Sequence, residues 1–269
     1  MSPDGQYLAF VSGLDYTTIP TTYLPKGDES LEVLDLDTGE RRLLHGPLNG
    51  MSYHRFWWSP SGQRIGYLVG PWRHKRGAVG PTDFDLYVTD LPSGETNLVY
   101  RLEGAHSLPS VTWSPSGSWL LVEVEREGPI EEEIPESGGQ LESPGISRMG
   151  RVQERLLVNA ETGEVQPWQI EGEDVFRYGW ALNDDFLVYR AGENLYSESV
   201  NGDVRKLATI YGDECQDYDS IGWSPDGRYI GLSGYWQAIA ILDTTTGEAR
   251  ILFREEGENT YIFPYGWWQ

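Results

Sequence analysis

A repeated turn motif is the feature that most constrains how this chain folds. It reads FWWSPSG at 56–62, VTWSPSG at 111–117 and IGWSPDG at 221–227, with a degenerate copy, YGWALNDD, at 178–185. Proline presets φ and glycine tolerates positive φ, so each copy predicts a strand that ends in Trp and then a tight turn. Recurrence of the motif indicates a fold built from similar units in tandem.

A second turn motif alternates with the first and lies between two short apolar runs. Its copies are DLDTGE at 35–40, DLPSGE at 90–95, NAETGE at 159–164, DTTTGE at 243–248 and the degenerate SVNGDV at 199–204. The pattern predicts a strand, a turn and a second strand. Each unit therefore has four antiparallel strands, called a, b, c and d, with one motif between a and b and the other between c and d. No segment has a sustained helical period, so we expect almost no helix.

Tandem four-stranded units predict an all-β fold, a β-propeller of four-stranded antiparallel blades. A β-sandwich would not repeat both turns in every unit. We expect one domain over residues 1–269 with five blades, in which the motif Trp packs between neighbouring blades. The blades are expected at 1–44 with 263–269, 56–100, 111–168, 178–208 and 221–253.

The first unit lacks a strand a. It has apolar runs for strands b, c and d at 7–12, 31–36 and 41–44, whereas the C-terminal run 263–268 reads as a strand a without a unit. Because propellers leave no open sheet edge, we expect the C-terminal strand to close the ring inside blade 1. The alternative is a fragment of a longer array of blades.

The combination of WSPSG or WSPDG, an apolar strand and a T/S-G-E turn resembles the TolB-type propeller repeat. Similar repeats build the propeller domains of prolyl-oligopeptidase-type proteins. The resemblance implies a scaffold role for the motif residues Trp58, Ser59, Pro60 and Gly62. Those peptidases carry Ser-Asp-His chemistry on a separate hydrolase domain, and this chain contains no G-x-S-x-G motif. Five units also fall short of the six blades usual for TolB-type propellers.

The connections between strands b and c differ sharply in length. They are long at 13–30, 71–85 and 126–153 but short at 191–194 and 234–237. The first three therefore extend from one face of neighbouring blades, opposite the tight turns. Long loops on a rigid scaffold are where binding residues concentrate.

The long connections contain the candidate binding residues. Tyr16, Tyr23, Trp72 and Arg73 are the expected anchors, since aromatic residues and arginine dominate binding hot spots. Further candidates on the same face are His74, Arg76, Tyr218 and Trp236. We therefore expect a non-catalytic interaction or scaffolding module with a protein partner, and WRHKR at 72–76 favours an acidic one.

Charge and composition exclude several classes of partner. The formal net charge is −22, from 42 acidic and 20 basic residues, which disfavours nucleic acid. No apolar run approaches the roughly 18 residues of a membrane-spanning helix. Cys215 is the only cysteine, so no intrachain disulfide forms. No signal peptide is visible, so we expect a cytoplasmic protein as given, or a periplasmic or other extracytoplasmic one if an upstream segment is missing. Oligomeric state is left open.

The sequence offers no catalytic residue, metal site or cofactor that we would assign. His45, His54, His74 and His106 are expected in loops around blade 2, without the close spacing of metal ligands. The acidic segment 213–220 lacks the spacing of an EF-hand loop. Two alternatives stay open: a small glycosidase- or peptidase-like hydrolase acting at the channel mouth, and a propeller fragment of a larger receptor or peptidase.

Overall fold

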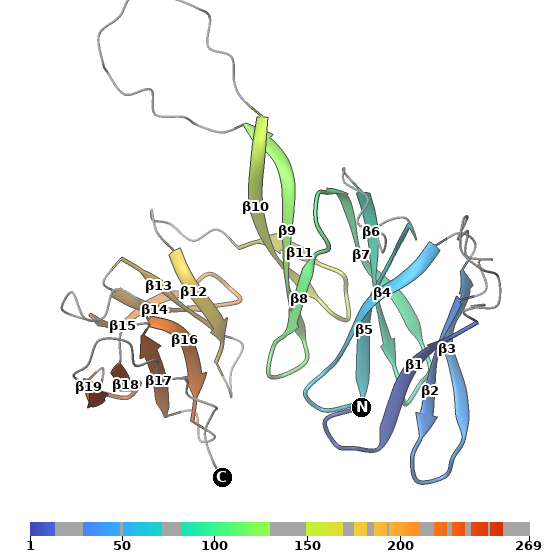
Figure 1. Cartoon of the computed structure of the whole chain (residues 1–269), viewed down its shortest axis with the longest axis horizontal. Coiled ribbons are helices and arrows are strands. Elements are labelled where there is room, and N and C mark those ends of the chain that lie inside the picture. The colour runs from blue at the N-terminus through green and yellow to red at the C-terminus, as the bar shows by residue number, and fades with distance from the viewer. Residues whose placement is uncertain are drawn as a thin grey trace, which may run out of the picture. The chain divides into compact units, whose positions relative to one another are not determined.

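The computed structural model consists of β-strands joined by turns and longer connections (Figure 1). It describes residues 1–13, 29–48, 51–71, 82–129, 149–168, 175–181, 186–192, 194–209, 218–224, 228–234, 238–246 and 248–254. Within these ranges there is no helix, and hence none long and apolar enough to cross a membrane.

Nineteen strands are described. In chain order they are β1 (Tyr7–Ser12), β2 (Glu29–Asp35), β3 (Arg41–Leu48), β4 (Met51–Trp58), β5 (Arg64–Pro71), β6 (Thr82–Asp90), β7 (Thr96–Ala105), β8 (Ser110–Trp113), β9 (Trp119–Pro129), β10 (Met149–Asn159), β11 (Val165–Pro167), β12 (Val175–Trp180), β13 (Phe186–Ala191), β14 (Asn194–Ser199), β15 (Val204–Thr209), β16 (Tyr218–Trp223), β17 (Tyr229–Gly234), β18 (Ala238–Asp243) and β19 (Ala249–Arg254).

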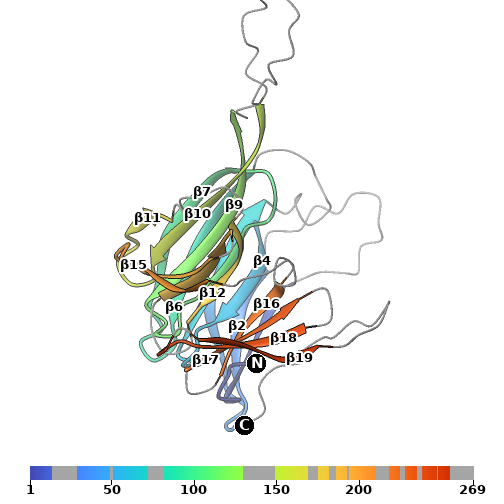
Figure 2. The same ribbon diagram turned by 90° about the vertical axis from the view of Figure 1, so that its left-hand side faces the viewer.

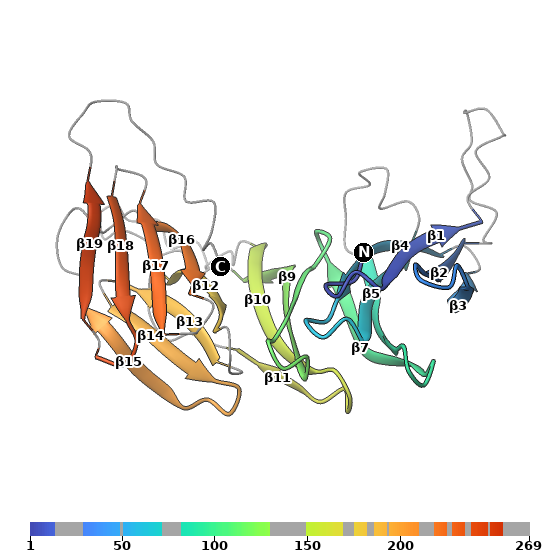
Figure 3. The same cartoon turned by 90° about the horizontal axis from the view of Figure 1, so that it is seen from below.

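The strands form five antiparallel sheets in chain order. The first contains β1 to β3, and the others contain β4 to β7, β8 to β11, β12 to β15 and β16 to β19, the last of which Figure 3 shows side by side. This arrangement confirms the predicted all-β propeller architecture of four-stranded antiparallel blades. The blade ranges, the total of five and closure by 263–269 stay predictions, because residues 255–269 lie outside the described part of the chain.

The chain divides into two compact units. One comprises Met1–Trp113 and Gly117–Trp168, which include the first three sheets, and the other comprises Ser114–Ser116 and Gln169–Gln269, which include the last two.

Strand β5 carries the core of the first unit because its two faces pack against different sheets. Ile65, Tyr67 and Val69 lie in a cluster with residues of β1, β2 and β3, whereas Leu68 belongs to a cluster with β8, β9 and β10. Ile65, Tyr67 and Leu68 are all fully buried. Burial of each such side chain contributes about 1.5–3 kcal/mol, so the stacking of sheets on both faces of β5 stabilises the unit.

The motif Trp packs between sheets, as the sequence predicts. Trp113 at the end of β8 lies against Gly66 of β5, where an added Cβ would be 3.2 Å from its ring. Its indole Nε1–H donates to the carbonyl of Trp57 in β4 at 3.1 Å. Trp58 at the end of β4 stacks on Tyr7 of the preceding sheet, with ring centroids 6.5 Å apart.

The second unit repeats this stacking with its two sheets. Val188, Leu195 and Ala208 of β13 to β15 pack against Ile230, Ala240 and Leu242 of β17 and β18.

The Ser of the first motif holds the turn together. Ser59 is fully buried, its Oγ accepts the Arg64 N–H at 3.0 Å, and its own N–H donates to the Arg64 carbonyl at 2.9 Å. Ser2 and Ser224 make the same pair of contacts with Tyr7 and Tyr229. The motif is therefore an anchor between strands a and b.

The second motif is closed by an Asp or Asn at its first position. The Asp90 carboxylate accepts from the Ser93 N–H at 3.0 Å, and Gly94 has a φ of 71°, which disfavours other residues. The N–H of Leu91 donates to the Gln63 carbonyl at 2.9 Å, which ties this turn to the first motif. Both turns of a blade therefore lie at one end of the sheet, called the turn end, and the b–c connection lies at the other, called the connection end.

Candidate functional site

The residues predicted to bind a partner lie almost entirely outside the described ranges. This holds for Tyr16, Tyr23, Trp72, Arg73, His74, Arg76 and Trp236. Tyr218 begins β16, but its side chain is not described. The proposed binding surface therefore stays a prediction, and the structure shows only the strand ends from which its connections start.

The third b–c connection is shorter than predicted because its strands continue further. β9 runs to Pro129 and β10 resumes at Met149, whereas the sequence predicts a loop over 126–153. β8 pairs with β9 only as far as Glu123. Beyond that point β9 and β10 pair with each other alone and form a two-stranded ribbon that extends past the rest of the sheet (Figures 1 and 2).

Charged side chains brace this ribbon against the second sheet. Arg126 Nη1 donates to the Glu103 carbonyl near the end of β7 at 2.6 Å. Within the ribbon, Arg126 Nε lies 2.6 Å from the Glu154 carboxylate of β10. His106, just after β7, has its Nε2 3.1 Å from the Glu127 carboxylate. These contacts fix the direction in which the ribbon leaves the sheet.

A polar cluster lies at the base of the ribbon. Gln153 Nε2 donates to Glu123 Oε1 at 3.1 Å, and Arg155 Nη2 donates to Gln153 Oε1 at 3.2 Å. Burial raises the pKa of the Glu123 carboxyl, and the Arg155 charge partly offsets this rise. The cluster could bind polar groups, but nothing in its geometry supplies a nucleophile and a base.

A buried carboxylate supports the root of the first b–c connection. Glu29, the first residue of β2, is 1% exposed. Its Oε2 accepts from Ser52 Oγ at 2.6 Å and from the Tyr53 N–H at 3.1 Å. These hydrogen bonds offset the energetic cost of removing the carboxylate from water, and they join the connection ends of the first two sheets. No sequence signal marks Glu29, since it closes an ordinary polar segment.

The expected loop positions of the histidines are wrong for two of them. His45 lies in β3 and His54 in β4. His45 sits among Tyr87, Tyr67 and Tyr53, at centroid distances of 4.7, 5.6 and 6.0 Å. Burial lowers the pKa of His45, so it is neutral near pH 7 and packs as a partly buried ring among these tyrosines. The sequence did not predict strands at these positions because the polar histidines interrupt the apolar pattern of each strand.

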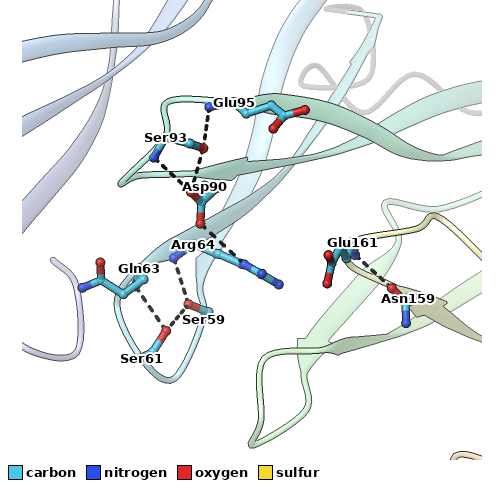
Figure 4. Close-up of polar contacts among 9 residues, drawn as sticks. All are labelled: Ser59, Ser61, Gln63, Arg64, Asp90, Ser93, Glu95, Asn159 and Glu161. Atoms are coloured by element: carbon cyan, nitrogen blue, oxygen red, sulfur yellow. Dashed lines mark hydrogen bonds and ion pairs between the residues drawn. The ribbon is translucent and has the colours of Figure 1, made fainter.

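A polar pocket of about 220 Å³ lies at the turn end, between the second and third sheets. It is lined by Arg64, Val88, Asp90, Ser93, Glu95, Asn97, Ala160 and Glu161. Figure 4 shows the Arg64 side chain extending from Asp90 toward Glu161. Hydrogen bonds from Ser93 lower the pKa of Asp90, aided by Arg64, whose Nε lies 3.7 Å away. One cation and three carboxylates make the pocket net negative, which suits cationic groups.

A second pocket shows that this hollow is a product of the repeat. It has a volume of about 240 Å³ and is lined by Tyr7, Val33, Asp35, Glu40 and Arg42 of the first sheet. Asp35 and Asp90 both begin a second-motif turn, and Glu40 and Glu95 both end one. Since similar turns produce similar hollows, the pockets follow from blade geometry rather than from a specialised site.

Comparisons with known proteins support the fold but do not identify a function. No family model matches the sequence, and no curated protein matches it. Among solved structures, oligogalacturonate lyase from Vibrio parahaemolyticus superposes with a TM-score of 0.54 and 15% identity, over 94% of this chain and 64% of that one. An oligogalacturonate lyase in complex with manganese gives 0.54 and 14%, over 94% and 75%.

TolB from Acinetobacter baumannii gives a TM-score of 0.43 and 18% identity over 93% of this chain. This chain spans 53% of the length of that TolB. The fold is thus of the propeller type that the repeat motifs predict. At 14–18% identity these likenesses show the fold alone and leave the function undetermined.

Proposed function

We propose that this chain is a non-catalytic propeller module that binds a protein partner through the b–c connections of its first three sheets. The carrying observation is the inequality of these connections. They join Ser12 to Glu29, Pro71 to Thr82 and Pro129 to Met149, whereas the last two join Ala191 to Asn194 and Gly234 to Ala238. Extra chain length on one side of a repeated scaffold supports binding at that side.

The residues at the strand ends where the long connections begin, here called their roots, support this role. Glu29 is held by Ser52 and Tyr53, and Arg126 is held by Glu154 and Glu103. Fixed roots lower the conformational entropy that a loop loses when it binds. The same end of the repeat therefore combines variable length with fixed starting points.

Anchor residues in the second connection provide the test. Trp72→Ala and Arg73→Ala should each weaken partner capture by more than about 1 kcal/mol, because Trp and Arg dominate binding hot spots. The full chain is used as bait, and the captured proteins are quantified by mass spectrometry. Arg205→Ala, at an exposed position in β15, is the matched control.

The proposal requires proteins that the parent chain and Arg205→Ala both capture and that Trp72→Ala and Arg73→Ala lose. An unchanged set of captured proteins for both loop variants would contradict binding through this connection. Far-ultraviolet circular dichroism of each variant separates loss of binding from loss of fold.

A further inference from the structure

The β9–β10 ribbon has one edge that is partly covered and one that is open. On the β9 side, the His106 N–H donates to the Glu125 carbonyl at 2.8 Å, so the segment between β7 and β8 covers part of that edge. On the β10 side, β11 pairs only with the C-terminal end of β10, and the Trp168 N–H donates to the Arg155 carbonyl at 2.8 Å. Among the described residues, no strand lies beside β10 on this side over 149–154.

The backbone groups that face the open edge follow from the contact at Arg155. Its carbonyl points toward β11, and backbone groups alternate between the two sides of an antiparallel strand. The N–H and C=O groups of Arg151 and Gln153 therefore face the open edge. Those of Val152 and Glu154 face β9 instead.

This edge lacks the features that guard the last strands of the sheets. Proteins protect exposed edges with bulges, proline, lysine or very short strands. Register shifts interrupt the pairing of β3, β7, β15 and β19 with their neighbours, and β11 has only three residues. The β9–β10 ladder is unbroken from Met149 to Asn159, and 149–154 contains neither proline nor lysine. Such an edge is suited to the addition of another strand.

We propose that the open edge of β10 pairs with the same edge of a second copy of this chain, antiparallel and about a twofold axis at Val152. A strand that pairs with its own counterpart forms a closed, isologous contact. In this register Arg151 of each copy lies opposite Gln153 of the other, and each of these pairs can exchange both of its N–H···O bonds. The two ribbons then form one continuous four-stranded sheet, in the order β9, β10, β10, β9.

The side chains beside the edge favour a second copy as the occupant. Val152 is 43% exposed, and it is the only exposed large hydrophobic side chain of the ribbon in the described part of the chain. The twofold register sets it directly against Val152 of the second copy, so that each covers the other. Glu154 would lie opposite Gly150 of the second copy, and its carboxylate is already 2.6 Å from Arg126 Nε. A register centred on Gln153 would instead set the exposed Val152 against Glu154.

The charge of the protein determines how salt affects this contact. Two chains of net charge −22 repel each other, and salt screens such repulsion beyond roughly 8 Å at physiological ionic strength. The ribbon extends past the rest of its sheet, so its edge can pair without close packing of the sheets themselves (Figure 2). Because the paired segment 150–154 is short, we expect a weak dimer that added salt strengthens.

Sedimentation equilibrium of the full chain over a series of concentrations tests the contact. The parent should show a monomer–dimer equilibrium that shifts toward dimer when salt is raised. Val152→Lys sets like charges opposite each other at the twofold axis and should weaken association at least about tenfold. Val204→Lys is the matched control, since Val204 is a strand valine that is 55% exposed and the change in net charge is the same. A parent that stays monomeric at every concentration, or a dimer that Val152→Lys leaves intact, would overturn the proposal.

A disulfide tests the register. Antiparallel residues that do not bond to each other have Cα atoms about 4.5 Å apart, which a disulfide can bridge. In a Cys215→Ser background, Val152→Cys should therefore give a cross-linked dimer with oxidised glutathione, whereas Val204→Cys should not. Absence of the cross-link at 152, or equal cross-linking at both positions, would contradict the twofold pairing.

Amide hydrogen exchange separates a second copy from other occupants of the edge. The Arg151 and Gln153 amides should become protected as protein concentration rises, in step with the dimer fraction. Protection of these two amides at concentrations where the chain is monomeric would show that another part of the same chain covers the edge, and would overturn the assignment to a second copy.

Discussion

The two ends of the blades follow opposite rules. At the turn end, Ser2, Ser59 and Ser224 make the same contacts in three sheets, and the turn glycines Gly5, Gly62 and Gly94 all have φ between 71° and 76°. At the connection end the first three sheets differ from one another in the described residues. One has a buried carboxylate, another a charged ribbon. What repeats is therefore the scaffold, and the proposed binding uses the part that varies.

Loss of the motif Trp should have the largest effect. Trp113→Ala removes a ring that packs on Gly66 and donates to the Trp57 carbonyl, and it leaves a cavity between the second and third sheets. We expect a loss of about 3–5 kcal/mol in the free energy of unfolding. Urea denaturation followed by fluorescence measures it, and a loss below 1 kcal/mol would mean that the sheets are not held together through this ring.

A substitution at the connection end should affect both stability and binding. Glu29→Ala leaves the Ser52 hydroxyl and the Tyr53 N–H without their shared acceptor. We expect a loss of about 2–3 kcal/mol in unfolding free energy and weaker partner capture, because the first long connection loses its root. Glu29→Gln keeps an acceptor and should retain more of both. If Glu29→Ala unfolds more easily but captures partners as well as the parent, the first connection does not take part in binding.

The turn end offers a matched pair of serines two residues apart. Ser59 is fully buried and accepts the Arg64 N–H, whereas Ser61 is exposed. Ser59→Ala should cost about 1–2 kcal/mol in unfolding free energy and Ser61→Ala less than about 0.5 kcal/mol. Neither should change partner capture at temperatures where the protein is folded. Equal effects of the two variants would show that the motif Ser is not the anchor of the turn.

The turn end could be predicted from sequence because its causes are local. Pro and Gly at fixed turn positions determine the backbone, and both motifs, the strand order and the packing of Trp113 follow from them. The contacts of the connection end depend on residues distant in sequence. The Glu29 carboxylate accepts hydrogen bonds from Ser52 and Tyr53 of the next sheet, and bulges between Glu29, Leu31 and Glu32 shift the register of β2 and β3. The sequence pattern likewise did not place His45 in a strand, because the tyrosines that surround it come from three other strands, β4, β5 and β6.

A pH titration should give the smallest effect, and it tests whether His45 belongs to the scaffold or to a responsive surface. Burial among Tyr53, Tyr67 and Tyr87 lowers the pKa of His45 from the 6.5 of an exposed imidazole. The unfolded chain therefore binds a proton at a higher pH than the folded chain does. Stability from the neutral imidazole is present above pH 6.5 and is lost as pH falls below it.

The difference in unfolding free energy between the parent and His45→Gln isolates this group from the carboxylates, which titrate at lower pH. That difference should shift slightly against the parent as pH falls from 7.5 to 5.5, and the shift should be small because His45 is only partly buried. Partner capture should not follow the same curve, because His45 lies between the first two sheets rather than on a b–c connection. A capture curve that tracks the titration of His45 would instead make this histidine part of the binding response, and would remove the separation between a constant scaffold and a variable binding end.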